Sequence, residues 1–120
     1  MKQLLLADYA EETDIAERVM KDYEVSSEEL SRYDILAAGY WAGDYEGSGW
    51  VLLMENATGE LYENYGSHCS CYGLEGQWSP TKSSREFILS AHFNSRDMIA
   101  AEENAVRALV ANLPTASSQP

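Results

Sequence analysis

Residues Trp50–Tyr65 read WVLLMENATGELYENY and decide the fold. Two segments rich in apolar and aromatic side chains flank Asn56–Gly59, where asparagine and glycine tolerate the positive φ that a tight connection needs. The stretch therefore predicts a β-hairpin with a four-residue loop. In that register Glu55 faces Glu60, and two glutamates directly opposite one another cost up to roughly 1 kcal/mol.

The same register divides the hairpin side chains between two faces. Val51 pairs with Asn64, and Leu53 pairs with Tyr62, on one of these faces. The other face is more apolar, which predicts that it is the core side of the sheet. This predicted core face holds Trp50, Leu52, Met54, Leu61 and Tyr65, with Glu63 at its margin.

Amphipathic segments precede the hairpin. Residues Glu11–Tyr23 have apolar side chains at spacings of three and four and acids in the first turn, which predicts a helix. Ser26 and Glu29 have capping-box spacing and predict a second short helix that ends near Tyr33. Ile35–Ala42 then predicts a strand that leads into a turn-rich loop, DYEGSG.

Two further helices are predicted after the central region. Ser83 and Glu86 repeat the capping-box spacing ahead of a helix that runs through Ala91. Arg96–Leu113 carries the most regular apolar stripe in the chain, and Pro114 ends it. Residues 115–120 form a polar tail that is expected to be flexible.

These elements predict a single α+β domain over residues 1–114. Its sheet is expected to be small and antiparallel, with about three strands. The N-terminal and C-terminal helices are expected to pack on one face of that sheet. No internal repeat or linker divides the 120 residues.

The chain is strongly acidic. Twenty acids against eight bases give a formal net charge of -12, and residues 33–81 contain no lysine or arginine. This charge repels polyanions, which argues against direct binding to nucleic acid or to an anionic membrane. The N-terminus has the pattern of neither a signal peptide nor a membrane span. Because Cys69 and Cys71 are too close for an unstrained disulfide, a reducing cytoplasm is expected.

Acids alternate with aromatic residues along the base-free segment. One interpretation is that the acids keep an aromatic-rich sheet soluble. The other is that carboxylates on a rigid sheet bind a basic groove of a partner, with aromatic side chains as anchors. The predicted partner-binding residues are Asp44, Tyr45, Glu46, Glu55, Glu60, Tyr62 and Glu63.

The stretch Tyr65–Trp78, YGSHCSCYGLEGQW, holds both cysteines and three of the eight glycines. Its candidate zinc ligands crowd onto one short turn, and the sequence does not select a fourth ligand. In the alternative, the glycines permit tight turns while the cysteines and Trp78 pack inward as a scaffold. A cysteine nucleophile would lack an orienting third group. The zinc candidates are His68, Cys69 and Cys71, with His92 or Glu75 as the fourth.

The motif GSHCSCYGLEGQW, followed by Pro80 and preceded by a hairpin that ends in ELYE, resembles a motif of small uncharacterised proteins encoded by bacteriophages and related mobile elements. The resemblance covers roughly residues 38–90 and implies a phage origin. In size and charge the chain also resembles the inhibitors that phages use against host defence, including anti-CRISPR proteins and DNA mimics. That resemblance implies a basic nucleic-acid channel as the target.

The leading functional hypothesis is therefore a non-enzymatic, anti-CRISPR-like inhibitor without a cofactor. Its expected partner is a nucleic-acid-binding defence protein or complex in the host cytoplasm. No phosphate loop, G-x-S-x-G or H-E-x-x-H motif indicates an enzyme. The alternative hypothesis is a zinc-binding adaptor or regulatory domain organised by His68, Cys69 and Cys71.

Overall fold

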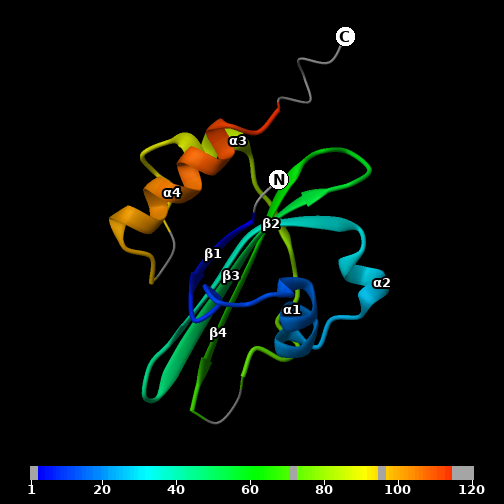
Figure 1. Cartoon of the computed structure of the whole chain (residues 1–120), viewed down its shortest axis with the longest axis vertical. Coiled ribbons are helices and arrows are strands. Elements are labelled where there is room, and N and C mark those ends of the chain that lie inside the picture. Colours follow the sequence, from blue (N-terminus) through cyan, green and yellow to red (C-terminus); the bar gives the residue numbers. More distant parts are fainter. Residues whose placement is uncertain (1–2, 71–72, 95–96, 115–120) are drawn as a thin grey trace.

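The computed structural model describes residues 3–70, 73–94 and 97–114 and places one sheet between helices (Figure 1). The strands are β1 (Leu4–Ala7), β2 (Tyr33–Ala42), β3 (Glu46–Glu55), β4 (Leu61–Cys69) and β5 (Thr81–Lys82). The helices are α1 (Ile15–Tyr23), α2 (Ser27–Leu30), α3 (Arg85–Leu89) and α4 (Ala100–Ala111). No helix in the described part of the chain is long and apolar enough to cross a membrane.

The central hairpin forms in the predicted register. Leu53 lies opposite Tyr62, and Val51 lies opposite Asn64. The backbone N–H of Glu55 donates to the carbonyl of Glu60 at 2.8 Å and closes the loop. Gly59 has a φ of 76°, the left-handed conformation that the NATG sequence favours.

The sheet is larger than predicted, although the α+β class is confirmed. The described residues form five strands in the order β1-β2-β3-β4-β5. The β1 strand pairs in parallel with β2, so that Ala7 lies opposite Tyr40, and the other neighbouring strands are antiparallel. The predicted number of strands, about three, is therefore too small. The short segments Leu4–Ala7 and Thr81–Lys82 extend the sheet at its two edges.

The DYEGSG stretch is only partly a loop. The strand β3 already begins at Glu46, and the backbone N–H of Gly43 donates to the Glu46 carbonyl at 2.6 Å to close a second hairpin. Glycines in this strand leave room for side chains from neighbouring elements. A Cβ at Gly47 would lie 2.6 Å from His68 Nε2 and 3.1 Å from the Tyr40 hydroxyl.

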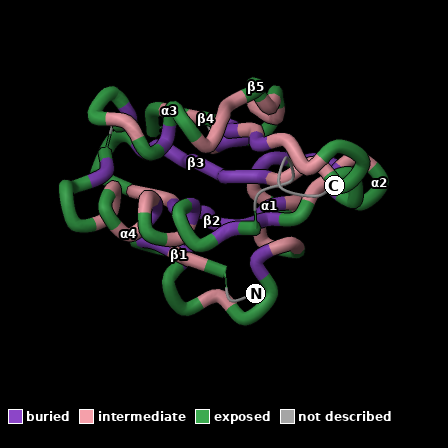
Figure 2. Tube along the Cα trace, turned by 90° about the horizontal axis from the view of Figure 1, so that it is seen from above, coloured by how far each residue is buried: buried purple, intermediate pink, exposed green. Residues whose placement is uncertain are grey.

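Helices cover both faces of the sheet, which corrects the prediction of helices on one face (Figures 1 and 2). On one face, Trp50 and Leu52 pack in a cluster with side chains of α3 and α4. On the other face, Val51 and Leu53 pack in a second cluster with side chains of α1 and α2. These four side chains of β3 are fully buried, so the hydrophobic core extends over both faces of this strand.

The helices begin at capping side chains. Asp14 Oδ1 accepts from Glu17 N at 3.1 Å and caps α1, which begins at Ile15, four residues after the predicted start at Glu11. Ser26 caps α2 as predicted, with Glu29 N donating to its hydroxyl at 3.1 Å. Ser84, rather than Ser83, caps α3.

The last helix, α4, begins at Ala100 instead of Arg96. Ile99 precedes it, and the Ile99 N–H donates to Glu102 Oε1 at 3.1 Å. Arg96 and the predicted tail at 115–120 lie outside the described residues.

Candidate functional site

The predicted partner-binding residues lie at two ends of the sheet. Asp44 and Tyr45 lie in the β2–β3 turn and Glu46 begins β3, whereas Glu55 and Glu60 flank the β3–β4 turn. These turns are separated by the length of β3, whose ten residues span about 30 Å at the usual rise per residue. The seven predicted residues therefore do not form one continuous surface.

The acids at the β3–β4 turn are matched by bases. Lys82 Nζ lies 2.9 Å from Glu60 Oε1, and Arg32 Nη2 lies 3.4 Å from Glu55 Oε2. The hydrogen bond and charge of Glu60 raise the pKa of Lys82 above its ordinary value. Thr58 also donates to Glu55 Oε1 at 2.8 Å. Glu55 and Glu60 are therefore each paired with a base, and Arg32 also contacts Glu29 at 3.3 Å.

Two of the predicted residues belong to the packed part of the fold. Glu63 is only 4% exposed, which removes it from the predicted partner surface. Its side chain turns inward because Trp50 Nε1 and the Ser83 hydroxyl each donate to it at 2.7 Å. Tyr62 is half-buried and packs edge-on against Tyr33, with 5.7 Å between ring centroids.

The β2–β3 turn carries the most exposed aromatic side chain among the described large hydrophobic residues. Tyr45 is 78% exposed, and the adjacent Asp44 and Glu46 are exposed acids. In Figure 1 this turn lies at one extreme of the long axis, beyond the helices. An aromatic side chain held between two acids on a hydrogen-bonded hairpin provides both contact area and negative charge.

Further acids lie near the base of this hairpin. Asp8 follows β1, and its N–H donates to the Tyr40 carbonyl at 2.9 Å. Partial burial, followed by the charges of Asp22 and Asp8, raises the pKa of Tyr40; the charge of Arg18 lowers it, and that of Glu75 raises it. Both Asp8 and Glu75 therefore act electrostatically on the β2 segment that enters the hairpin. We call Asp8, Asp44, Glu46 and Glu75 the acidic end.

Most described cations have bonding partners outside the acidic end. Arg18 bonds to Glu12 at 2.6 Å and to Asp22 at 2.8 Å. Arg85 donates to the Leu113 and Ala111 carbonyls, each at 2.8 Å. Arg107, Arg32 and Lys82 are likewise engaged elsewhere.

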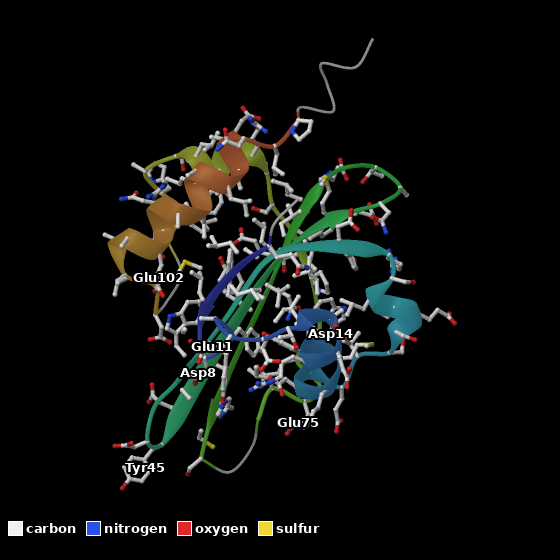
Figure 3. The ribbon with its side chains drawn as sticks, in the orientation of Figure 1. Asp8, Glu11, Asp14, Tyr45, Glu75 and Glu102 are labelled. Carbon is white, nitrogen blue, oxygen red and sulfur yellow. The ribbon has the colours of Figure 1, made fainter. Side chains whose placement is uncertain are left out.

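Figure 3 labels acids with different roles. Asp14 caps α1, and Glu102 accepts from Trp41 Nε1 at 3.3 Å, so both carboxylates serve the fold. Asp8 and Glu11 are exposed on the connection between β1 and α1. The sequence did not identify Asp8 as a candidate, because its position beside the hairpin depends on the parallel pairing of β1 with β2.

The zinc candidates do not assemble within the described residues. His68 Nε2 lies 2.6 Å from the Tyr40 hydroxyl, and His68 Nδ1 lies 2.8 Å from the Cys69 carbonyl. Since a carbonyl only accepts, Nδ1 carries the proton and Nε2 accepts from Tyr40 in the neutral ring. Adjacent residues of a strand point to opposite faces, which separates His68 from the Cys69 side chain.

The described residues among the other candidate ligands form no metal-binding group. Cys71 lies outside the described residues. His92 is on the connection between α3 and α4, and Glu75 accepts from Gly73 N at 2.9 Å. Within residues 3–70, 73–94 and 97–114, no group of three His, Cys, Asp or Glu side chains has a metal-binding arrangement.

Comparison with protein-family models, curated proteins and solved structures finds no match to this chain. The resemblance to phage proteins therefore stays an expectation from the motif. Function is proposed below from the side chains and their geometry.

Proposed function

We propose that the protein is a non-enzymatic inhibitor that binds a basic nucleic-acid-binding surface of a host defence complex, in the manner of an anti-CRISPR protein. The acidic end supplies the binding surface, and no cofactor takes part. One observation carries the proposal: the exposed acids Asp44 and Glu46 flank the exposed Tyr45 on the β2–β3 hairpin, and the charges of Asp8 and Glu75 from two other connections reach Tyr40 of β2.

Charge supplies long-range attraction in this proposal. A net charge of -12 favours approach to a cationic surface and discourages approach to nucleic acid itself. Carboxylates on a rigid scaffold meet the lysine and arginine side chains that otherwise hold phosphates, so the inhibitor and the nucleic acid compete. Binding is then expected to weaken steeply with salt.

Tyr45 supplies short-range contact. Tyrosine is enriched among residues that dominate interface energies, because it combines a large apolar ring with a hydroxyl. Its 78% exposure means that burial by a partner removes much apolar surface from water. The closed β2–β3 turn limits the ordering cost of that burial.

The proposal is tested with the immobilised full chain and lysate from a host that carries defence systems. Asp8→Asn with Asp44→Asn removes two charges at the acidic end, and Glu55→Gln with Glu60→Gln removes two at the opposite end. We expect the wild type and the second variant to capture a nucleic-acid-binding complex, with about tenfold weaker capture by the first. Double-stranded DNA or guide RNA should displace the captured complex.

Two outcomes would contradict the proposal. Equal capture by both double variants would show that the acidic end is not the contact surface. Capture that persists unchanged in excess DNA and RNA would show that the partner is not bound through its nucleic-acid surface. Tyr45→Ala separates the contributions, because it should weaken binding while leaving the salt dependence unchanged.

A further inference from the structure

A cleft of about 530 Å³ lies over β4, β5 and the start of α3. It is far from the β2–β3 turn and plays no part in the proposed inhibitor surface. Glu63, Tyr65, Ser83 and Phe87 contribute to its lining, together with Lys82. A buried carboxylate thus borders a cavity with two aromatic side chains.

Among the described residues, the hydrogen-bond donors to the Glu63 carboxylate are all neutral. Trp50 Nε1 and the Tyr65 hydroxyl each donate to Oε1 at 2.7 Å. The Ser83 hydroxyl donates to Oε2 at 2.7 Å. A carboxylate has about four acceptor positions, so one position on Oε2 remains open. Glu63 and Ser83 both line the cleft, so the carboxyl group and its hydroxyl donor border the same space.

The charge of Glu63 has no cation beside it in the described part of the chain. Lys82 is the cation of the cleft lining, and its ammonium pairs with Glu60 Oε1 at 2.9 Å. A charge that is buried without an opposite charge carries a desolvation cost that neutral hydrogen bonds only partly offset. A bound cation would remove that imbalance.

Aromatic rings border the same space. Tyr65 is 47% exposed and Phe87 is 41% exposed, although both lie against packed elements. Phe87 is held edge-on against Phe93 with 6.1 Å between ring centroids. Aromatic faces attract organic cations, and the attraction grows when the cation is partly removed from water.

We propose that this cleft binds an organic monocation, an alkylammonium or guanidinium group, through Glu63 Oε2 and the rings of Tyr65 and Phe87. Burial, and then the hydrogen bond to Glu63, raise the pKa of Tyr65, so this phenol stays a donor to the carboxylate. The cation takes the open acceptor position without displacing Trp50 or Ser83. The ligand is either a free amine or a basic side chain of a partner.

The test is a titration of the isotope-labelled full chain with butylammonium and with methylguanidinium, followed by amide chemical shifts in 0.15 M salt. Butanol and N-methylurea are the neutral controls of similar shape. We expect saturable shifts centred on residues 63, 65, 83 and 87 for the cations and none there for the neutral probes. Nα-acetyl-lysine methylamide identifies the source: binding at least as tight as butylammonium indicates a partner side chain, and weaker binding indicates a free amine.

Two variants decide whether Glu63 holds the cation. Glu63→Gln keeps an acceptor for Trp50 and Tyr65 but removes the charge, and it should weaken binding by about tenfold or more. Phe87→Leu should weaken it by about threefold and covers the case in which Glu63→Gln does not fold. Unchanged affinity in folded Glu63→Gln, or in Phe87→Leu if that variant alone folds, would overturn the proposal. Cation-induced shifts confined to the acidic end would also overturn it.

Discussion

Trp50 donates a hydrogen bond of 2.7 Å from its indole Nε1 to Glu63 Oε1, although the two residues are not direct partners in the β3–β4 ladder. Trp50 lies opposite Tyr65, which donates to the same oxygen at 2.7 Å. One buried carboxylate therefore satisfies two aromatic donors on neighbouring strands. Trp50 also packs in the hydrophobic cluster beneath α3 and α4, so its hydrogen bond links that cluster to β4.

Removal of the Glu63 carboxylate is expected to destabilise the fold. Glu63→Ala leaves the Trp50 indole and two hydroxyls without their acceptor, which should lower the free energy of unfolding by about 2–4 kcal/mol. Urea denaturation followed by tryptophan fluorescence measures the change. Glu63→Gln preserves most of the hydrogen bonds and should lose clearly less. Equal losses in the two variants would show that the carboxylate does not organise these donors.

Gly49 makes room for Tyr23 of α1. A Cβ at position 49 would overlap the Tyr23 hydroxyl and lie 2.9 Å from Leu74 Cδ1. Gly49→Ala should therefore lower the free energy of unfolding by about 1–3 kcal/mol. In a Tyr23→Phe background the cost should fall by about 0.5 kcal/mol or more, because the overlapping oxygen is gone.

Gly76→Ala is the matched control for this pair. Gly76 has a φ of 76°, and a Cβ at this position would meet no atom of the described residues within 4 Å, so its cost comes from the backbone alone. Chemical denaturation of all single and double variants gives the two coupling energies. A coupling between positions 49 and 23 no larger than that between 76 and 23 would contradict the packing explanation.

Alkaline pH should destabilise the protein through its buried tyrosines. Burial, followed by the hydrogen bond to Asp22, raises the pKa of Tyr9, and burial also raises the pKa of Tyr23. The unfolded chain loses these protons near pH 10, while the folded chain keeps them. Stability is therefore complete below pH 10 and falls above it, by about 1.4 kcal/mol per pH unit for each such phenol.

Unfolding measured by urea between pH 9 and pH 12 gives this slope. Tyr9→Phe should make the slope shallower by about 1.4 kcal/mol per pH unit, since one linked proton is removed. It should also lower stability at neutral pH by about 1 kcal/mol through loss of the 2.7 Å bond to Asp22. An unchanged slope would mean that Tyr9 ionises in the folded protein as readily as in the unfolded chain.

Local sequence predicted the parts of the fold that depend on local interactions. The NATG turn set the register of the β3–β4 hairpin, and Ser26 predicted its own helix cap. The β1 and β5 strands were missed because each is short and joins the sheet through pairing with a distant segment. Strands of two or four residues carry too little periodicity to predict that pairing.

The number of covered faces was misjudged for a different reason. The segment WVLLM is apolar at five consecutive positions, a pattern typical of a strand that is buried on both faces. Interpreted as an alternating strand, it predicted that Val51 and Leu53 face away from the core. Both are fully buried beneath α1 and α2, so the continuous apolar run was the better signal.

The candidate site was predictable only at the β2–β3 turn. Composition alone marked Asp44 and Tyr45 as exposed residues in a turn-rich stretch, and the structure places them there. The inward direction of Glu63 was not predictable, because its hydroxyl donor Ser83 lies twenty residues away in the chain. Charge counts do not distinguish an exposed acid from one with buried donors.

Gln77 protects the edge of β4. Its Oε1 accepts from Ser67 N at 2.7 Å, and its Nε2 donates to the Ser67 carbonyl at 2.8 Å. These are the two backbone groups that a neighbouring strand would bind, whereas β5 pairs only with Tyr62 and Glu63. The side-chain amide therefore substitutes for a strand at a point where an open edge invites association with another chain.

Gln77→Ala should expose that edge. We expect hydrogen exchange of the Ser67 amide to rise by about tenfold, and the variant to self-associate at high concentration in size-exclusion chromatography. Gln77→Asn is the matched control, because it keeps the amide but shortens its reach by one methylene, and it should behave like the alanine variant. If Gln77→Asn matched the wild type, or if Ser67 exchange stayed slow in Gln77→Ala, another group would have to cover this edge. The extent of self-association should depend on salt, because repulsion between copies with a net charge of -12 opposes pairing at low ionic strength.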